Sequence, residues 1–285
     1  MISCLFIHIG KKTNQTQETL LMPMGIIALA DYLSKRGIPS RILHYNLSLL
    51  KDSNFSVIEF IRKKRVRIVC IPIHWHTQVS ETDRLIKLIK DKCNDVNIVV
   101  GGFTASFFWK ELINQNPGID FIIRGDAELP LLQLCNAILR GDNNYKDIPN
   151  LVWRLGKSII ENVHSYTITE DILDTLEYSN FDLVIDNDYF LKGIWRLENS
   201  NVVKSEIAKR KNIFYYNPGR GCQVNCSFCG GSNTSQLLLN KRKKAIFKSV
   251  ESVIRDLKKA ASYGVDTIYT CFDPEPKGSY YINLF

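Results

Sequence analysis

Three cysteines stand close together in the sequence at CxxxCxxC spacing: Cys222, Cys226 and Cys229. They lie in a glycine-flanked segment, residues 221–231, that follows the apolar run of residues 213–216. Three thiolates on one short loop can bind three irons of a [4Fe–4S] cluster, which leaves the fourth iron without a protein ligand from the motif. An iron with an open coordination position is a place for substrate chemistry. The spacing therefore predicts an iron–sulfur site with a catalytic use.

Two structural roles for the same cysteines compete with this prediction. A structural zinc site needs four ligands, usually as two paired groups, yet no second CxxC or HxxxH pair follows, and Cys271 lies 42 residues beyond Cys229. Disulfides are disfavoured because the remaining cysteines stand singly in apolar segments and no signal peptide precedes them. We interpret four of them as small core residues: Cys4, Cys70, Cys93 and Cys135.

The motif, with the aromatic Phe228 just before its last cysteine, resembles the signature of the radical S-adenosylmethionine (radical SAM) family. The resemblance continues through a helix-like stretch at residues 249–263, which Gly264 ends, and a strand at residues 266–272. It implies that the three cysteines hold the cluster, that SAM chelates the open iron, and that reduction cleaves SAM to a 5′-deoxyadenosyl radical. It also implies a set of residues beside SAM: Phe228, Gly230, Gly231, Asp273 and Glu275.

Residues 1–140 alternate between strand-like and helix-like stretches, which predicts a parallel sheet with helices on both faces. We expect strands at residues 2–9, 40–45, 67–73, 97–100 and 119–123. Helices are expected from Pro23 to Gly37, over residues 79–94 and over residues 128–139. The fold class is therefore α/β, a Rossmann-like (flavodoxin-like) parallel sheet followed by a partial (β/α) radical SAM barrel.

Ligands of open α/β sheets bind beyond the carboxyl ends of the strands. In this sequence that edge carries His8, His74, Trp75, His76, Thr77, Gly101, Gly102, Gly125 and Glu128. The order of these pieces resembles the cobalamin-binding domain that precedes many radical SAM domains, and the resemblance implies that these residues contact cobalamin. The Asp-x-His-x-x-Gly motif of other cobalamin proteins is absent, so we expect binding without a histidine ligand to cobalt. Polar capping of nearby backbone is the alternative role of His74 and His76, and dinucleotide binding is disfavoured because no GxGxxG follows a strand.

Composition limits the other possibilities. The chain has 285 residues, is 45% apolar and carries a net charge of +8. Basic runs at residues 62–67 and 241–244 raise nucleic-acid binding as an option, but no aromatic–basic interleaving accompanies them. No apolar run approaches the roughly 18 residues of a membrane span, and the apolar start is interpreted as a buried strand, not a signal peptide. We expect a cytoplasmic protein without a membrane partner.

The predicted organisation is a cobalamin-binding-like domain over residues 1–140, a linker with a small β-hairpin over residues 141–210, and the start of a radical SAM domain over residues 211–285. Within the linker, residues 151–155 and 159–160 flank a turn. The resemblances imply a cobalamin-dependent methyltransferase or a related radical enzyme. Its reductant would be a protein such as flavodoxin or ferredoxin, and its substrate cannot be inferred.

Two other functions stay open at this point: a non-catalytic cobalamin-binding module with a vestigial cluster loop, and a zinc-stabilised adaptor or nucleic-acid-binding protein. A six-unit barrel needs roughly 200 residues, whereas residues 223–285 supply about two strands and one helix. We therefore expect a chain that is truncated within the barrel, or one that a partner chain completes.

Overall fold

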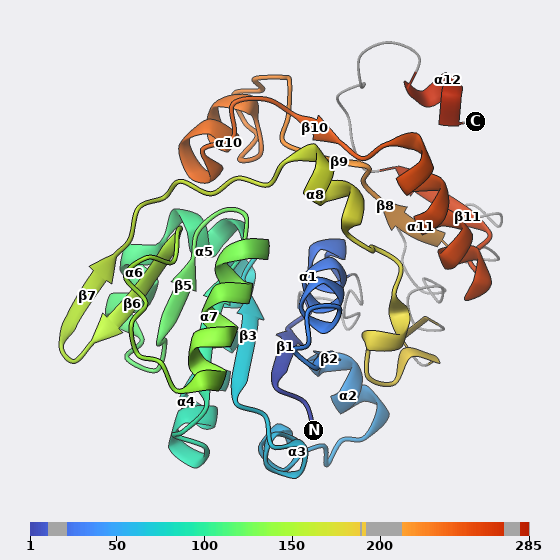
Figure 1. Ribbon diagram of the computed structural model, residues 1–285. Helices are drawn as coiled ribbons and strands as arrows, with labels where there is room; N and C mark the ends of the chain where they lie inside the picture. The colour runs from blue at the N-terminus through green and yellow to red at the C-terminus, as the bar shows by residue number, and fades with distance from the viewer. Residues whose placement is uncertain (11–21, 189, 192–212, 271–279, 285) are drawn as a thin grey trace.

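A computed structural model of the chain describes residues 1–10, 22–188, 190–191, 213–270 and 280–284. Its centre is a sheet in the order β2-β1-β3-β4-β5-β6-β7 (Figure 1). The first five strands are parallel: β1 (Cys4–His8), β2 (Ser40–His44), β3 (Ile68–Pro72), β4 (Asn97–Gly101) and β5 (Phe121–Ile123). All five predicted strands are thus confirmed. Their order is flavodoxin-like, and in such sheets a ligand binds between β1 and β3, where successive strands begin to add on the opposite side of β1.

A hairpin extends the sheet beyond its parallel part. Strands β6 (Leu151–Leu155) and β7 (Ser158–Glu161) form the predicted hairpin, and β6 pairs antiparallel with β5. Trp153 of β6 is buried, and its indole Nε1 donates a hydrogen bond to Asn162 at 3.2 Å. The hairpin, expected in a linker, is therefore an edge of the main sheet.

Helices cover both faces of the sheet, as the alternation predicted. The expected ones are α1 (Met24–Ser34), α4 (Val79–Lys92) and α7 (Glu128–Arg140). Shorter helical segments join them: α2 (Tyr45–Lys51), α3 (Val57–Lys64), η1 (His76–Gln78), α5 (Phe103–Phe107), α6 (Trp109–Gln115), α8 (Glu170–Thr175) and η2 (Phe181–Leu183). The basic run that begins at Arg62 ends α3 directly before β3.

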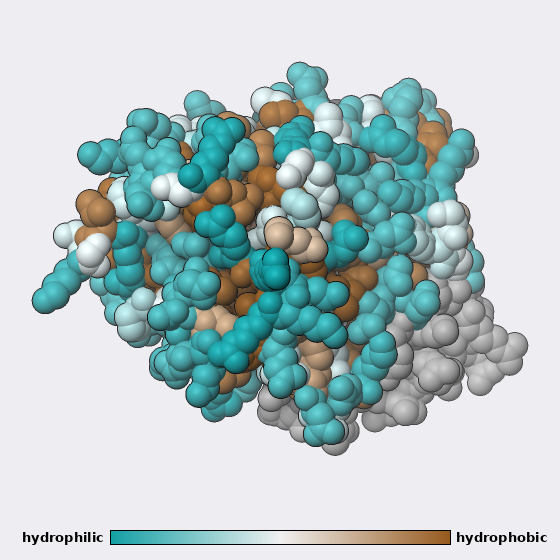
Figure 2. All heavy atoms as spheres, turned by 60° about the horizontal axis from the view of Figure 1, so that its bottom comes forward, coloured by the Kyte–Doolittle hydropathy of each residue, from teal (hydrophilic) through white to brown (hydrophobic). Residues whose placement is uncertain are grey.

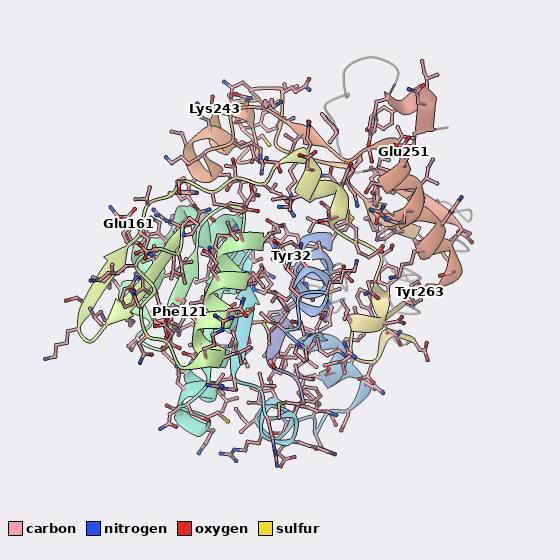
Figure 3. The ribbon with its side chains drawn as sticks, viewed as in Figure 1. Tyr32, Phe121, Glu161, Lys243, Glu251 and Tyr263 are labelled. Carbon is pink, nitrogen blue, oxygen red and sulfur yellow. The ribbon has the colours of Figure 1, made fainter. Side chains whose placement is uncertain are left out.

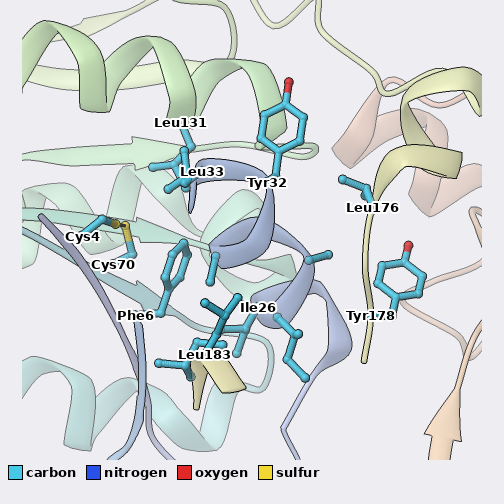
Figure 4. Close-up of a cluster of buried hydrophobic side chains, with 14 of the residues drawn as sticks. Cys4, Phe6, Ile26, Tyr32, Leu33, Cys70, Leu131, Leu176, Tyr178 and Leu183 are labelled. Atoms are coloured by element: carbon cyan, nitrogen blue, oxygen red, sulfur yellow. Dashed lines mark hydrogen bonds between the residues drawn. The ribbon is translucent and has the colours of Figure 1, made fainter. Parts of the chain in front are cut away.

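The sheet separates two apolar cores because side chains alternate along each strand. Phe6 and Cys4 of β1 belong to the core under α1 and α7, whereas Leu5 and Ile7 belong to the core under α3, α4 and α6. Figure 4 shows Cys4, Cys70 and Phe6 on the sheet, close to Leu33 of α1. Cys4, Cys70, Cys93 and Cys135 are all buried, so their predicted role as core residues is confirmed.

The C-terminal part begins a second α/β unit. Strands β8 (Ile213–Tyr216) and β11 (Thr267–Thr270) pair in parallel, with helix α11 (Val250–Ser262) between them in sequence. This is the predicted order of strand, loop, helix and strand. Further elements are β9 (Gly219–Arg220), α10 (Asn233–Asn240), β10 (Ile246–Phe247) and α12 (Tyr280–Leu284), and β9 pairs antiparallel with β10.

The two parts share one core. Phe214 and Tyr216 of β8 belong to the same buried cluster as the α1 face of the sheet, and the ring of Phe181 lies 5.5 Å from that of Phe214. Tyr263, at the end of α11, packs edge-on against Phe181 at 5.3 Å, on the side of the molecule where Figure 3 labels it. The C-terminal unit is therefore held against the sheet domain by packing.

One face of the molecule is largely polar. On the face shown in Figure 2, hydrophilic side chains surround smaller apolar areas, as is usual for folded proteins. Within the described residues, the helices are all too short or too polar to cross a membrane.

Candidate functional site

A cavity of about 340 Å³ lies where the carboxyl ends of the sheet strands meet the C-terminal unit. The sheet domain contributes the ends of β3, β4 and β5 and the start of α1 to its walls. The C-terminal unit contributes Asn217, the strand β9, Gly221 and one side of α10. The volume lies within the range of small-molecule sites. The cavity is thus built by both parts of the chain at the edge where the sheet order predicts a ligand.

Five of the residues predicted at this edge line the cavity: His74, Gly101, Gly102, Gly125 and Glu128. The structure brings these together from three separate strand ends. Their contact with cobalamin stays a prediction, but their convergence on one cavity is what such a contact requires.

The other four residues predicted at the edge lie outside the cavity lining. His8 is buried at the end of β1, with its ring 5.0 Å from that of His44 and 6.5 Å from that of Trp75. Trp75 is half-buried, and His76 and Thr77 are exposed in η1. The 3-10 helix η1 begins at His76, which carries His76 and Thr77 away from the cavity.

Two glycines fix the backbone of the cavity wall. Gly102 has φ of 98°, and a Cβ atom there would lie 2.7 Å from the carbonyl oxygen of Ile73. Gly125 has φ of 70°, and its Cβ would lie 3.0 Å from Nε2 of His164 and 3.3 Å from Cα of Asn240 in α10. Side chains are disfavoured at both positions for two reasons: L-residues rarely adopt positive φ, and a Cβ atom would lie too close to neighbouring atoms. Gly125 also shows how closely the turn after β5 approaches the C-terminal unit.

His74 is held at the cavity rim by its backbone. Its N–H donates to Oε1 of Gln78 at 2.9 Å, and its carbonyl accepts from the Thr104 hydroxyl at 2.9 Å. Burial lowers the pKa of His74 to about 4, so the imidazole is neutral near pH 7. Gln78, which sequence reasoning missed, also donates to the Ile9 carbonyl at 2.6 Å and so ties the ends of β1 and β3 together. The available signal was a polar residue soon after the end of a predicted strand.

Charged side chains connect the two walls. Arg220 of β9 contacts Oδ1 of Asp126 at 3.1 Å and Oε1 of Glu128 at 2.6 Å. Arg242 contacts Oδ2 of the same Asp126. Burial opposes the charge on Arg220, but the carboxylates of Glu128 and Asp126 outweigh it and raise the pKa of the guanidinium well above its ordinary value.

The role of these charges was not anticipated. Arg242 belongs to the basic run at residues 241–244, which raised nucleic-acid binding as an option, yet Arg242 is buried and paired with Asp126. Lys243 of that run is exposed in the segment that follows α10 (Figure 3). Arg220 carried no sequence signal beyond its place before the cysteine motif.

The three cysteines lie on the loop between β9 and α10. Cys222 and Cys226 are partly exposed, and Cys229 is exposed. The N–H of Val224 donates to Sγ of Cys222 at 3.4 Å, and that of Gly231 donates to Sγ of Cys229 at 3.4 Å. Backbone N–H groups directed at cysteine sulfurs are among the features that tune iron–sulfur clusters, so the donor set of this loop fits such a cluster.

The loop does not itself display a formed metal site. Among the described residues, no group of three His, Cys, Asp or Glu side chains lies close enough together to hold a metal ion. Cluster ligation by Cys222, Cys226 and Cys229 therefore stays a prediction.

The residues predicted beside SAM are only partly described. Phe228 is 91% exposed on the cysteine loop, and space is open around Gly230. A Cβ on Gly231 would meet only Sγ of Cys229, at 3.8 Å. Asp273 and Glu275, like Cys271, lie outside the described residues.

Comparison with known proteins agrees with this arrangement. Residues 11–134 match the family described as the B12 binding domain. The anaerobic magnesium-protoporphyrin IX monomethyl ester cyclase of Synechocystis is 22% identical over 211 residues, which cover 74% of this chain and 38% of the cyclase. The hopanoid C-3 methylase of Methylococcus capsulatus is 25% identical over 158 residues, which cover 54% of this chain and 30% of the methylase.

A solved structure shares the fold. OxsB, described as a cobalamin-dependent S-adenosylmethionine radical enzyme with aqua-cobalamin and S-adenosylmethionine bound, matches 99% of this chain with a TM-score of 0.68 and 14% identity. The match covers 36% of OxsB. This chain thus spans less than two fifths of the length of these relatives.

The five-stranded parallel core, its cavity at the strand ends and the family match together define a B12-binding domain in the N-terminal half of the chain. Likeness in fold extends past that domain, because the match to OxsB covers 99% of the chain and so includes the segment that carries the cysteines. The chain is a homologue of B12-dependent radical SAM enzymes.

Proposed function

We propose that the chain binds cobalamin at the carboxyl edge of its sheet and binds a [4Fe–4S] cluster with SAM at the cysteine loop, as part of a cobalamin-dependent radical SAM enzyme. The proposed reaction is methyl transfer or a related radical reaction on a substrate whose identity is open. When bound, the cluster and SAM would supply a 5′-deoxyadenosyl radical, and cobalamin would supply a transferable methyl group.

One observation carries this proposal: a single cavity is lined by both the strand ends of the B12-binding domain and the segments that flank the cysteine loop. Gly221 lines the cavity, and Cys222 follows it directly in the chain. A reaction that uses two cofactors needs their reactive atoms near each other, since holding reactants in place supplies a large part of a rate acceleration. A shared wall provides that proximity.

The chain's own residues have definable roles in this arrangement. Cys222, Cys226 and Cys229 would hold the cluster as thiolates. Gly101 and Gly102 keep the end of β4 free of side chains, so that a flat ligand can approach the backbone. Apolar side chains such as Phe6, Ile71, Val99 and Leu131 line the cavity and exclude water from it.

His74 fits a cobalamin site in which histidine is not the cobalt ligand. Its low pKa leaves the imidazole neutral, so an approaching cobalt centre would meet no positive charge. The prediction from the missing Asp-x-His-x-x-Gly motif is that the cofactor spectrum does not depend on this side chain.

Anaerobic reconstitution of the purified chain with iron and sulfide tests the cluster. We expect brown protein with broad visible absorption, and Ala substitutions at all three motif cysteines should lose the bound iron and sulfide. Cys93→Ala is the matched control, because Cys93 is a buried cysteine in the core under α4, away from the loop. A triple variant with iron and sulfide equal to wild type would refute the cluster assignment.

Mixing with hydroxocobalamin, followed by desalting, tests the other half of the proposal. We expect the cofactor to stay bound, with a spectrum that survives His74→Ala. Loss of all cobalamin on desalting would contradict cobalamin binding. A colourless, zinc-containing protein would instead favour the zinc-stabilised adaptor, and bound cobalamin without iron would favour the non-catalytic module.

The proposed chemistry requires an electron donor and a reducing environment. Reduction of the cluster requires a one-electron donor, for which a flavodoxin or ferredoxin is proposed. An oxygen-sensitive cluster requires a reducing compartment, so we propose a cytoplasmic location.

A further inference from the structure

Both ends of the cysteine loop are fastened to one carboxylate. Arg220 immediately precedes residues 221–241, which carry the three cysteines and α10, and Arg242 immediately follows them. Oδ1 of Asp126 binds Arg220 and Oδ2 binds Arg242. Asp126 belongs to the turn after β5, on the B12-binding domain, and it lines the cavity. The side chain of Asp126 on the B12-binding domain therefore holds both ends of the cysteine loop.

Asp126 is itself rigidly held. Its Oδ2 accepts the N–H of Ile168 at 2.9 Å, and its carbonyl oxygen accepts a hydrogen bond from the Asn150 side chain at 3.2 Å. Asp126, Asn150 and Arg242 are all buried. A buried carboxylate between two guanidinium groups has little freedom to rotate, because losing either partner would leave a buried charge uncompensated.

The same network reaches the ligand cavity. Glu128 is 1% exposed, lines the cavity, and uses Oε1 to bind Arg220. Its other oxygen, Oε2, is buried and has no hydrogen-bond partner among the described residues. An unpaired buried carboxylate oxygen is costly, so a donor N–H or O–H on a ligand in the cavity would satisfy it. A continuous path then runs from such a ligand through Glu128 and Arg220 to Cys222, two residues further on.

We propose that Asp126 is a positioning residue that couples the two cofactor sites, so that cluster and cobalamin each raise the affinity for the other. The coupling arises because the cluster orders the exposed cysteine loop, and the ordered loop fixes Arg220 and Arg242. These two arginines hold Asp126 and Glu128 in the cavity wall in the geometry that a ligand meets. Once one ligand has ordered these side chains, binding of the second ligand no longer includes the free-energy cost of ordering them.

This inference rests on the proposed function, and the test separates the two. Hydroxocobalamin affinity is measured by anaerobic equilibrium dialysis, with cobalt determined by elemental analysis, on the full chain with and without reconstituted cluster. We expect wild-type protein to bind at least about fivefold more tightly when the cluster is present, the lower end of typical coupling between sites. Asp126→Asn, which keeps the shape but removes the charge, should bring this ratio close to one.

Asp120→Asn is the matched control. Asp120 is a carboxylate near the start of β5, where it binds Lys90 at 2.6 Å and the N–H of Ile98 at 2.7 Å. It does not line the cavity, so this variant should keep the wild-type ratio. If circular dichroism shows that Asp126→Asn is unfolded, Arg242→Gln replaces it, since that change cuts only one of the two connections.

The outcomes are distinct. A wild-type ratio near one, with both cofactors bound, overturns the coupling and leaves the proposed function standing. A folded Asp126→Asn or Arg242→Gln variant that keeps the wild-type ratio also overturns it. Wild-type protein that retains no cluster, or no cobalamin, overturns the proposed function together with this inference.

Discussion

A fully buried ion pair anchors the C-terminal unit, and breaking it makes a sharp test of how that unit is held. Lys248 donates to Oδ2 of Asp256 on α11 and to the carbonyl of Leu176 at 2.7 Å. The hydroxyl of Tyr216 on β8 donates to the same Asp256 oxygen at 2.7 Å. Both charged side chains are 0% exposed. The network therefore links the strand before the cysteine loop, the helix after it and the connection from the sheet domain.

Lys248→Met should lower the free energy of unfolding by about 3–5 kcal/mol near pH 7, because it leaves the Asp256 carboxylate buried without its partner. Part of this loss, about 1–3 kcal/mol, comes from the Leu176 carbonyl, which loses its donor. The double variant Lys248→Met/Asp256→Asn should recover much of the lost unfolding free energy, since asparagine carries no charge and still accepts a hydrogen bond from the Tyr216 hydroxyl. Urea unfolding followed by circular dichroism measures all three proteins.

The pH dependence distinguishes a charge effect from a packing effect. Burial raises the pKa of Asp256 above its ordinary value of 3.8, and Lys248 counteracts that rise. In Lys248→Met the folded protein therefore keeps this proton to a higher pH than the unfolded chain does. Its unfolding free energy should fall, relative to wild type, as pH rises from about 4, by up to about 1.4 kcal/mol per pH unit until the folded-state pKa is passed.

The double variant has no titrating group at position 256 and should lack this additional fall. A Lys248→Met variant that loses the same free energy at pH 5 and pH 7, or less than about 1 kcal/mol at pH 7, would show that the pair is not a buried charge interaction.

Three further predictions concern the cavity. Gly102→Ala should destabilise the fold by about 1–3 kcal/mol and weaken hydroxocobalamin binding, as measured by urea unfolding and by dialysis. Gly141 also has positive φ but has open space around it, so Gly141→Ala should lower stability without affecting hydroxocobalamin binding. Burial lowers the pKa of His74 to about 4, so between about pH 6.5 and 4 the unfolded chain binds a proton at His74 and the folded chain does not. The free energy of unfolding should therefore decline on acidification through this range, and it should decline less steeply in His74→Asn. Gly125→Val should push the turn after β5 away from α10, seen as faster hydrogen exchange in α10; unchanged exchange there would contradict the close approach of these two segments.

The sequence predicts the sheet domain well because its strands are continuous apolar runs that end in glycine or polar residues. Residues 68–72 and 97–101 contain such runs, and both became buried parallel strands. Periodicity also predicts helices α1, α4 and α7, because their apolar residues recur at helical spacing. Local signals of this kind depend on neighbours within a few positions, and a single sequence displays them directly.

Helix α10 was missed for a physical reason. Leu237 and Leu238 are exposed, so its apolar residues do not form the one-sided pattern that reveals a helix. The available signal was its start, where the Ser232 hydroxyl accepts the N–H of Ser235. Serine before a polar first turn is a common helix start, but it is too frequent in loops to indicate a helix alone.

The charged contacts of the site could not be predicted, because their partners are far apart in sequence. Arg220 and Asp126 are 94 positions apart, and Arg242 and Asp126 are 116 apart. Each arginine considered alone is an ordinary surface residue, and burial is what makes its partner necessary. Only the docking of the C-terminal unit on the sheet domain brings the three together.

That docking explains why the two predicted sites must be considered as one. The turn after β5 approaches α10 so closely that a Cβ on Gly125 would lie 3.3 Å from the Asn240 backbone. One residue further on, Asp126 binds the arginines at both ends of the cysteine loop. This turn lines the cavity, and moving it would break the ion pairs at both ends of the loop. The glycine that permits the approach and the carboxylate that holds the arginines are adjacent in the chain, so the two ends of the cysteine loop are held by the B12-binding domain.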